Sequence, residues 1–567
     1  MAKDKKKKKK DKEQQDYGTG TFSQLIGGSS ETKSQKGKDK KTQKAVDISS
    51  GVQLGEQIDR SSDNLFLGTD YREVFIPERS WAEILEDVEH WTPLPFTHGI
   101  EMELIIADDN GDYPPGDEMV FRMKEIVKDA IKIMDQILYQ GRADFLPVPD
   151  FIRQKVMARP WGRDDLEKGF AMDIRYKLPN DVEVDIDTFA RDGNVTAVTY
   201  ILELVTPPCE YAEELAYWAS TLFLLAKNTL PNDLHIIASA INPAAKEYMR
   251  GLTQADHSHI GSFGSDLEKI QAYCMIRNFL PHIIALTCNS PILNNQPTDV
   301  VKIVNNRITA PNCVRSLRLK SNTTMLSNND PKHFIPYLTS GDDDAINHFL
   351  QVVQKASLED ARFQDVFPFT DWNTIEVRIS DAQISICRRI GIALLIQTLC
   401  YKAVKLLQKG VWVPDAGSET IAYNRKTSIE RGLISLFRPL NLSREHLAKY
   451  DATFAEQYLG PENQPVKYMT QAVQRMFFYL KDELKELGFL YSPFLKPVLQ
   501  SVFGDVSYAK PPITEAEYQL SLYKYKLDNG EDPNILYDLI YFTIQYCQDP
   551  LNNPLTGTLT LPKEMRE

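Results

Sequence analysis

Cysteine is scarce in this 567-residue sequence, and its seven cysteines are scattered without a single CxxC pair. Such spacing argues against a disulfide framework or a zinc knuckle and fits a reducing compartment. No run of 18 apolar residues is present, so no membrane-spanning helix is expected. The N-terminal lysines are not followed by an apolar stretch, so no secretory signal is expected either. We therefore expect a soluble, cytoplasmic protein.

Three common nucleotide and nucleophile motifs are also missing. The sequence has neither a GxxxxGK[ST] phosphate loop nor a GxGxxG turn that opens a helix after a strand. It has no GxSxG elbow that would present a nucleophilic serine. If the protein uses a nucleotide, metal ions and side chains must hold the phosphates.

Net positive charge is confined to the N-terminal segment. Residues 1–44 contain 14 Lys against 6 Asp or Glu, about +8, while the whole chain carries −13, which leaves about −21 for the remainder. An acidic body is a poor candidate for general nucleic-acid binding. Residues 1–65 have few large apolar side chains and are expected to form a disordered basic tail. Weak contacts of that tail with nucleic acid, a membrane surface or a protein partner are the alternative to a purely solubilising role.

The rest of the sequence is rich enough in apolar residues to form a large core, at 42% of the chain. Apolar spacing predicts helices over residues 81–91, 118–139, 211–228, 265–288, 385–407 and 468–487. Alternating or β-branched runs predict strands over residues 99–107, 182–187, 200–205, 234–239 and 375–379. Strands that come early and helices that dominate late indicate an α+β class.

Four short acidic or histidine-bearing motifs stand out in this body. Three of them place Glu inside an apolar, β-branched run, where a carboxylate is costly to bury unless it is paired or binds a metal. Together they favour one polar, metal-lined site. The motifs are Gly99-Ile100-Glu101-Met102-Glu103-Leu104, Leu202-Glu203-Leu204-Val205-Thr206-Pro207, His257-Ser258-His259 and Thr374-Ile375-Glu376-Val377-Arg378.

Glu101 and Glu103 are two residues apart, so in a strand both side chains point to one face. Two carboxylates on one face repel each other unless a cation lies between them, and this spacing suits a divalent metal. The alternative is an exposed edge strand with its polar face outward. Glu203 shares a strand face with apolar Ile201 and Val205, which makes a solvent face less favourable for it. Its alternative is a buried structural ion pair.

His257 and His259 are also two residues apart, so one imidazole could bind a metal while the other contacts a phosphate or substrate. A purely structural histidine pair is the alternative. The abundance of hard oxygen ligands favours Mg²⁺ or Mn²⁺ over zinc. Glu376 and Arg378 repeat the spacing, as a metal ligand beside an arginine that could reach a phosphate during phosphoryl transfer. A simple salt bridge between these two is the alternative.

The order and spacing of these motifs resemble glutamate–cysteine ligase family 2, the carboxylate–amine ligase branch of the glutamine synthetase-like enzymes. The resemblance covers roughly residues 97–435, with weaker echoes at Pro281-His282, Asn306-Arg307 and Asn424-Arg425. It implies an antiparallel sheet packed by helices, whose concave face carries two or three Mg²⁺ ions that bridge ATP. We expect the catalytic domain to cover residues 66–435. The mostly helical C-terminal region, 436–567, lies outside the resemblance and is expected to pack on that domain.

Site residues follow from the resemblance position by position. Arg378 would neutralise the γ-phosphate and, with Glu376 and Arg307, form the catalytic set, while His259 would contact ATP phosphate. Related ligases have an acidic residue where this chain has Thr196, so a third metal site would need an oxygen from Asp185 or Asp187. The implied metal ligands are Glu101, Glu103, Glu203, His257 and Glu376.

The implied function is ATP- and Mg²⁺-dependent formation of an amide through an acyl phosphate, with amino acids or small peptides as substrates, as in glutathione biosynthesis. Glutamate is the default acyl donor, and the acceptor amine is open. One alternative is the same fold acting as a kinase or as a modifier of a protein side chain. Another is a nucleotide-binding scaffold without turnover. Association into a homo-oligomer is also left open.

Overall fold

The computed structural model describes residues 81–112, 116–158, 176–177, 183–184, 201–237, 239–245, 254–298, 314–321, 342–355, 364–370, 372–439, 466–503 and 514–540. All of them belong to one compact unit, Val52–Glu567. The expected basic tail lies outside the described residues, and so do Arg307, Asp185, Asp187 and Thr196. The domain boundaries drawn from the sequence stay predictions.

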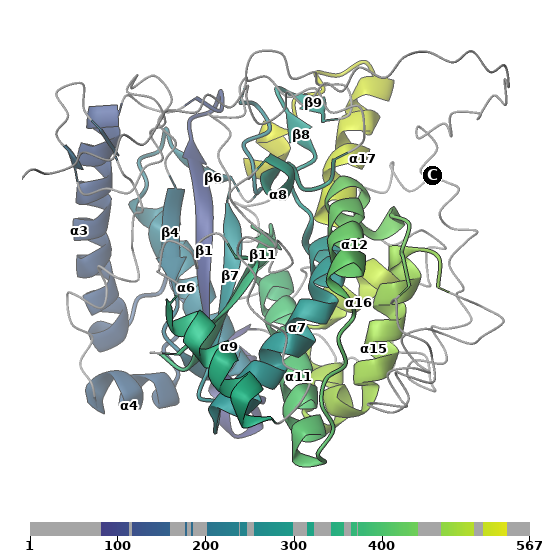
Figure 1. Ribbon diagram of the computed structural model, residues 1–567. Helices are drawn as coiled ribbons and strands as arrows, with labels where there is room; N and C mark the ends of the chain where they lie inside the picture. Colours follow the sequence, from purple (N-terminus) through teal and green to yellow (C-terminus); the bar gives the residue numbers. More distant parts are fainter. Residues whose placement is uncertain are drawn as a thin grey trace, which may run out of the picture. The chain divides into compact units, whose positions relative to one another are not determined.

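A seven-stranded sheet organises the described part of the chain (Figure 1). Its strands follow the order β10-β11-β7-β1-β4, and two further strands, β5 and β6, also pair with β1. Each of these pairings is antiparallel, which confirms the expected antiparallel sheet and the mixture of helices and strands. The concave shape of its face stays a prediction. The strands are β1 Pro93–Ala107, β4 Ile201–Val205, β5 Cys209–Tyr211, β6 His235–Ile237, β7 Ala255–Gly261, β10 Val366–Phe369 and β11 Thr374–Asp381.

One face of the sheet is buried under three long helices. Alternation along the strands points Met102 and Leu104 of β1 and Val377 of β11 into this layer, and all three are buried. The covering helices are α6 Ala212–Thr229, α7 Asp266–Thr287 and α11 Ile386–Gln408, which pack on β1, β4, β7, β10 and β11. The other face carries the polar residues of the same strands, and beyond them Ile105 and Ala107 of β1 join a second apolar cluster with Ile237 of β6.

Helix α11 is the one described helix that is long and apolar enough to cross a membrane. However, 83% of its most apolar window is buried inside the protein, as in the core helix of a globular domain. Tight contact explains part of this burial. A Cβ added at Gly391 of α11 would lie 2.3 Å from the carbonyl oxygen of Phe494, so the chain passes very close to the helix there.

The main helices were predictable from the sequence. The predicted helix over 118–139 is α3 Gly116–Gln140, the one over 211–228 is α6, and the one over 468–487 is α15 Met469–Glu486. Serine caps begin the other two, since Ser265 Oγ accepts a bond from Glu268 N at the start of α7 and Ser385 Oγ accepts one from Arg388 N at the start of α11.

Two strands differ from expectation. β1 begins at Pro93 rather than at Gly99, because proline is tolerated at the start of a strand. At that end β1 pairs with the short β5 through Pro93 and His98, with a register shift between them, and from Thr97 onward it also pairs with β7. The His257-Ser258-His259 motif lies in the middle of β7, a strand that its polar sequence did not predict.

The remaining elements are mostly short helices around this core. From residue 466 onward the described elements are helical, and α15 and α16 pack on α11 and α7. Of the predicted strand over 182–187, only residues 183–184 are described by the structure, and they form β3, which pairs with β2. These elements are α2 Trp81–Glu86, η3 Val88–His90, α4 Asp150–Ala158, β2 Tyr176–Lys177, β3 Glu183–Val184, β8 Ile292–Leu293, β9 Gln296–Pro297, α8 Leu317–Ser321, α9 Asp343–Lys355, α12 Ser418–Arg431, η5 Gly432–Ile434, η6 Phe489–Tyr491, α16 Lys496–Phe503 and α17 Glu515–Asp528.

Candidate metal and nucleotide site

The strand register brings all four sequence motifs onto the polar face of the sheet. Glu103 of β1 lies opposite Glu203 of β4, and Glu101 of β1 lies opposite His257 of β7. On the far side of β7, His259 lies opposite Glu376 of β11. Residues directly opposite each other in an antiparallel pair share one face of the sheet. Segments nearly 280 residues apart therefore supply one continuous row of carboxylates and imidazoles.

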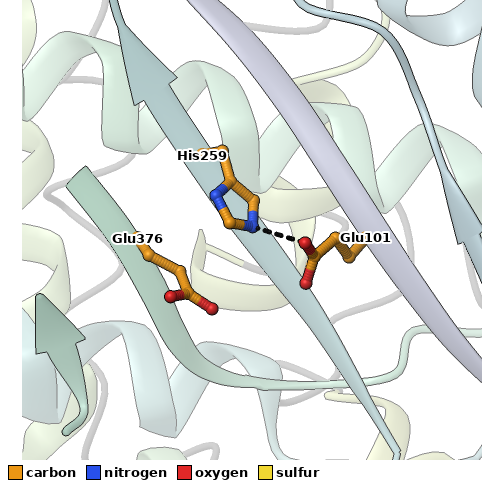
Figure 2. A group of neighbouring side chains, drawn as sticks. All are labelled: Glu101, His259 and Glu376. Atoms are coloured by element: carbon orange, nitrogen blue, oxygen red, sulfur yellow. Dashed lines mark ion pairs between the residues drawn. The ribbon is translucent and has the colours of Figure 1, made fainter. Parts of the chain in front are cut away.

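Glu101, His259 and Glu376 form the tightest group in this row (Figure 2). One potential ligand atom from each residue lies within 4.8 Å of the others. Figure 2 shows the three side chains pointing toward one another from β1, β7 and β11, with His259 Nε2 at 3.0 Å from Glu101 Oε1. Among the residues that the structure describes, no other set of three or more such side chains meets at this spacing.

His257 lies beneath this group and is almost completely buried, with 1% of its side chain exposed. Its Nδ1 is 3.1 Å from Glu101 Oε2, and its Nε2 is 3.8 Å from Glu103 Oε1. Burial lowers the pKa of His257 to about 3, assisted by the positive charge of Arg378, so the ring is neutral at physiological pH. When Nδ1–H donates to Glu101, the Nε2 lone pair has no hydrogen-bond partner within the described ranges. A buried imidazole lone pair that faces a carboxylate suits a metal ligand.

The carboxylates of the row differ sharply in acidity. Burial raises the pKa of Glu103 to about 7, although Arg378 and Arg318 oppose the shift. Burial, reinforced by the charges of Glu101 and Glu103, raises the pKa of Glu203 to about 9. Glu101 behaves in the opposite way. Burial would raise its pKa, but its contacts with the two histidines hold that pKa well below the usual range.

These acidities indicate that the row holds more negative groups than it can ionise at once. Protons on Glu103 and Glu203 relieve the repulsion in the metal-free protein. A divalent cation could relieve it instead and displace those protons. The donor set consists of carboxylate oxygens and imidazole nitrogens, without a thiolate, which matches Mg²⁺ or Mn²⁺. The residues present therefore fit the metal that the sequence implies.

Arg378 closes the row at the β11 end. Its Nη1 pairs with Glu376 Oε1, so the salt bridge foreseen as the alternative is present. Burial opposes protonation, but the nearby carboxylates, Glu376 first, raise the pKa of Arg378 above its usual value. The raised pKa keeps the guanidinium charged, and the Arg378 side chain remains 19% exposed at the edge of the row. An arginine in this place could receive a phosphate.

Two residues of the weaker sequence resemblances, His282 and Arg425, have defined contacts in the structure. His282 is buried between Phe279 and Phe437, with ring centroids 5.0 and 5.7 Å away, and burial lowers its pKa to about 3. Arg425 forms a fork with Asp365, through Nε and Nη2 at 2.7 and 2.8 Å. Neither side chain belongs to the polar row.

One arginine beside the site was missed by sequence reasoning. Arg318 of α8 donates from Nη2 to the backbone carbonyl of Arg378 at 2.9 Å, and it is 3% exposed. Its charge reaches Glu103, where it opposes the effect of burial. No sequence signal could have identified it, because a lone arginine in a five-residue helix has no distinguishing pattern.

No model of a known protein family matches this sequence, and no curated protein matches it. Among solved structures, a glutamate–cysteine ligase from Francisella tularensis in complex with AMP is similar, with 11% identity and a TM-score of 0.44, over 84% of this chain and 92% of that chain. A bifunctional glutathione synthetase from Pasteurella multocida has 13% identity and a TM-score of 0.39, over 80% of this chain and only 51% of that chain.

A third similar structure is the complex between the prokaryotic ubiquitin-like protein Pup and its ligase PafA. It has 11% identity and a TM-score of 0.37, over 83% of this chain and 78% of that chain. With TM-scores below 0.5, these likenesses leave the activity of this chain to be inferred from its own site residues. The resemblance to glutamate–cysteine ligases stays a prediction.

Proposed function

We propose that this protein is an ATP- and Mg²⁺-dependent carboxylate–amine ligase that forms an amide through an acyl phosphate. The observation that carries the proposal is the polar row itself. Carboxylates from β1, β4 and β11 and imidazoles from β7 share one sheet face, with Arg378 at its accessible edge. Phosphoryl transfer requires positioning and charge neutralisation more than it requires a protein nucleophile, and this row supplies both.

Two groups of side chains would hold the cations. Glu101, His259 and Glu376 would hold one, because their ligand atoms already converge. Glu103 and the free Nε2 of His257, 3.8 Å apart, would contribute to a second, with Glu203 beside them. When bound, Mg²⁺ supplies bridging and charge neutralisation of the ATP phosphates.

The protein's own part in the reaction is to position and neutralise. A substrate carboxylate oxygen attacks the γ-phosphorus and ADP leaves; an amine nitrogen then attacks the acyl carbon and inorganic phosphate leaves. Arg378 would contact the transferring phosphoryl group through the half of its guanidinium that Glu376 leaves free. His259, 31% exposed, would contact the phosphates or complete the first cation site. Glutamate is our default acyl donor, with an amino acid such as cysteine as acceptor.

Hydroxylamine provides a direct test, because it traps an acyl phosphate as a hydroxamate whatever the natural amine is. The protein would be incubated with Mg²⁺, ATP, hydroxylamine and single carboxylic amino acids, and both ADP and hydroxamate would be measured. Glu376→Gln should abolish both products, because it removes a ligand oxygen with little change in shape. Glu213→Gln is the matched control, since Glu213 of α6 is a buried carboxylate outside the row that accepts hydrogen bonds from Thr92.

The outcomes separate the alternatives. Hydroxamate from one carboxylate, lost in Glu376→Gln and retained in Glu213→Gln, would support the ligase and name its donor. ADP without hydroxamate would favour a kinase. ATP binding without ADP from any small donor would leave a protein side chain as substrate, or a scaffold without turnover.

A further inference from the structure

The strand that carries Arg378 is irregular at this residue. β11 and β7 are in register at Val377 opposite Ser258 and again at Ser380 opposite Asp256. Between these two pairs β11 contains one more residue than β7, so Arg378 lies in a bulge of the strand. Bulges bend a strand and change the direction of a side chain, and they occur often beside functional sites. The direction of the Arg378 side chain therefore depends on what fixes the bulge.

Both backbone groups of Arg378 bond to residues outside the named strands. Its N–H donates to the carbonyl of Asp365 at 2.9 Å, and Asp365 is itself held by the Arg425 fork. Its carbonyl accepts a bond from Arg318 Nη2 at 2.9 Å. A buried carbonyl without a partner costs free energy, so this guanidinium contact stabilises the bulged conformation.

Arg318 is in turn held by a buried polar cluster. Its Nη1 lies 3.7 Å from Asp381 Oδ1. Asp381 is 1% exposed and accepts bonds from Asn289 N, Ser290 Oγ and Ser316 Oγ at 2.8 to 2.9 Å. The 3.7 Å separation is an ion-pair contact rather than a hydrogen bond. Because both groups are buried, solvent screens their attraction little, and this attraction helps to hold the Nη2 contact to Arg378 in place.

We propose that Arg318 is a positioning residue, which fixes the bulge of β11 and thereby aims the Arg378 guanidinium along the polar row. The inference deepens the proposed function, on which it rests, because it identifies what holds the phosphate-facing arginine in place. Arg318 itself lies too deep to be the group that meets a substrate, at 3% exposure. Its planar fork can contact a carbonyl and a carboxylate together, which a lysine ammonium cannot do in the same geometry.

The first measurement follows the position of Arg378 without any ligand. The Nε–H signal of Arg378 would be recorded in the full chain labelled with ¹⁵N-arginine and assigned by its loss in Arg378→Lys. We expect Arg318→Lys to move or broaden this signal, although the charge at residue 318 is kept. Arg277→Lys is the matched control. Arg277 is a fully buried arginine that bonds Asp415 and Ser418, outside the row, and its replacement should leave the signal in place.

The second measurement is the affinity for a non-hydrolysable ATP analogue with Mg²⁺, by calorimetry. Arg318→Lys and Arg378→Lys should each weaken binding roughly ten- to hundredfold, the range found for residues that orient a site. The double variant should be no weaker than Arg378→Lys alone, because Arg318 acts through Arg378. Arg277→Lys should bind the analogue as the wild type does, whatever its effect on melting temperature.

Two results would overturn the inference. One is an Arg378 signal that stays in place in Arg318→Lys. The other is a double variant whose loss of affinity is the product of the two single losses, which would mean that Arg318 acts independently. Failure of the proposed function would look different, because the wild type would then bind no analogue while the Arg378 signal still reported on the bulge.

Discussion

Glu103 on β1 and Glu203 on the neighbouring strand β4 lie directly opposite each other on one face of the sheet. Burial raises the cost of ionising both carboxylates, and the negative charge of Glu101 adds to that cost for each of them. The result is a pKa of about 7 for Glu103 and about 9 for Glu203. The pair therefore retains protons at neutral pH. As a result, the free energy of unfolding depends on pH and on divalent cations.

The metal-free protein should lose stability as pH rises. The pKa of Glu203 is raised in the folded state from 4.5 to about 9, so the folded state binds more protons than the unfolded state across that window. Stability falls with pH wherever the folded state holds the extra proton. We expect the melting temperature in EDTA to decrease from pH 5 to pH 9, with Glu203→Gln reducing the slope. The free energy of unfolding should fall by at least about 1 kcal/mol over this pH range, since a shift of one pKa unit corresponds to about 1.4 kcal/mol.

Added Mg²⁺ should reverse part of this loss, because the cation replaces the protons on the row. A pH slope that is the same in the wild type and in Glu203→Gln would contradict the assignment of the proton to Glu203. Glu213→Gln tests specificity, since burial also raises the pKa of Glu213, to about 7, but no cation is expected beside it. Its replacement should leave the response to Mg²⁺ unchanged.

Mn²⁺ should bind to the group of Glu101, His259 and Glu376. Replacing Glu101 or Glu376 with Gln removes a charged ligand, and we expect the affinity for Mn²⁺ to fall at least about tenfold. His259→Asn should have a similar effect. Electron paramagnetic resonance of Mn²⁺ titrated into the protein measures the free ion directly. Undiminished binding in all three variants would place the cation elsewhere.

Asp381, the last residue of β11, should matter for stability. It is buried, and three donors and Arg318 surround it. Asp381→Ala would leave these groups without their acceptor, which we expect to cost about 3 kcal/mol in urea unfolding. Asp129→Ala is a suitable comparison, because Asp129 is 55% exposed and its partner Lys132 is 73% exposed, so its loss should change stability little. Equal stability of the two variants would show that the buried cluster contributes nothing.

Gly391 should not tolerate a side chain. An added Cβ would meet the Phe494 carbonyl oxygen at 2.3 Å and Val498 Cγ2 at 2.8 Å. The segment that contains these two residues would therefore have to move away from α11. We expect Gly391→Ala to destabilise the protein by about 1–3 kcal/mol. In Gly264→Ala the new Cβ would meet only the flexible end of Glu268, so the loss should be small. Equal unfolding midpoints for the two variants would be contrary to this packing.

The sequence predicts which side chains share a face of a strand, but it does not predict which strands lie next to each other. A spacing of two residues fixed that Glu101 and Glu103 share a face, as do Glu376 and Arg378, because strand geometry is local. The partner of each strand depends on contacts between segments hundreds of residues apart. His257 and His259 lie in a strand that polar residues obscure, since neighbouring strands rather than side-chain pattern determine β7. The role of Arg318 depends on the bulge in β11, and no pattern in the sequence indicates that bulge.

The polar row should transfer the γ-phosphoryl group of ATP to a substrate carboxylate. Carboxylate oxygens labelled with ¹⁸O test it directly, because formation and breakdown of an acyl phosphate moves one substrate oxygen into inorganic phosphate. The protein would be given Mg²⁺, ATP, hydroxylamine and ¹⁸O-labelled glutamate, or whichever carboxylate gives hydroxamate, and the phosphate analysed by mass spectrometry. We predict phosphate with one ¹⁸O, which disappears in Glu376→Gln. Phosphate that carries no label would contradict the claim.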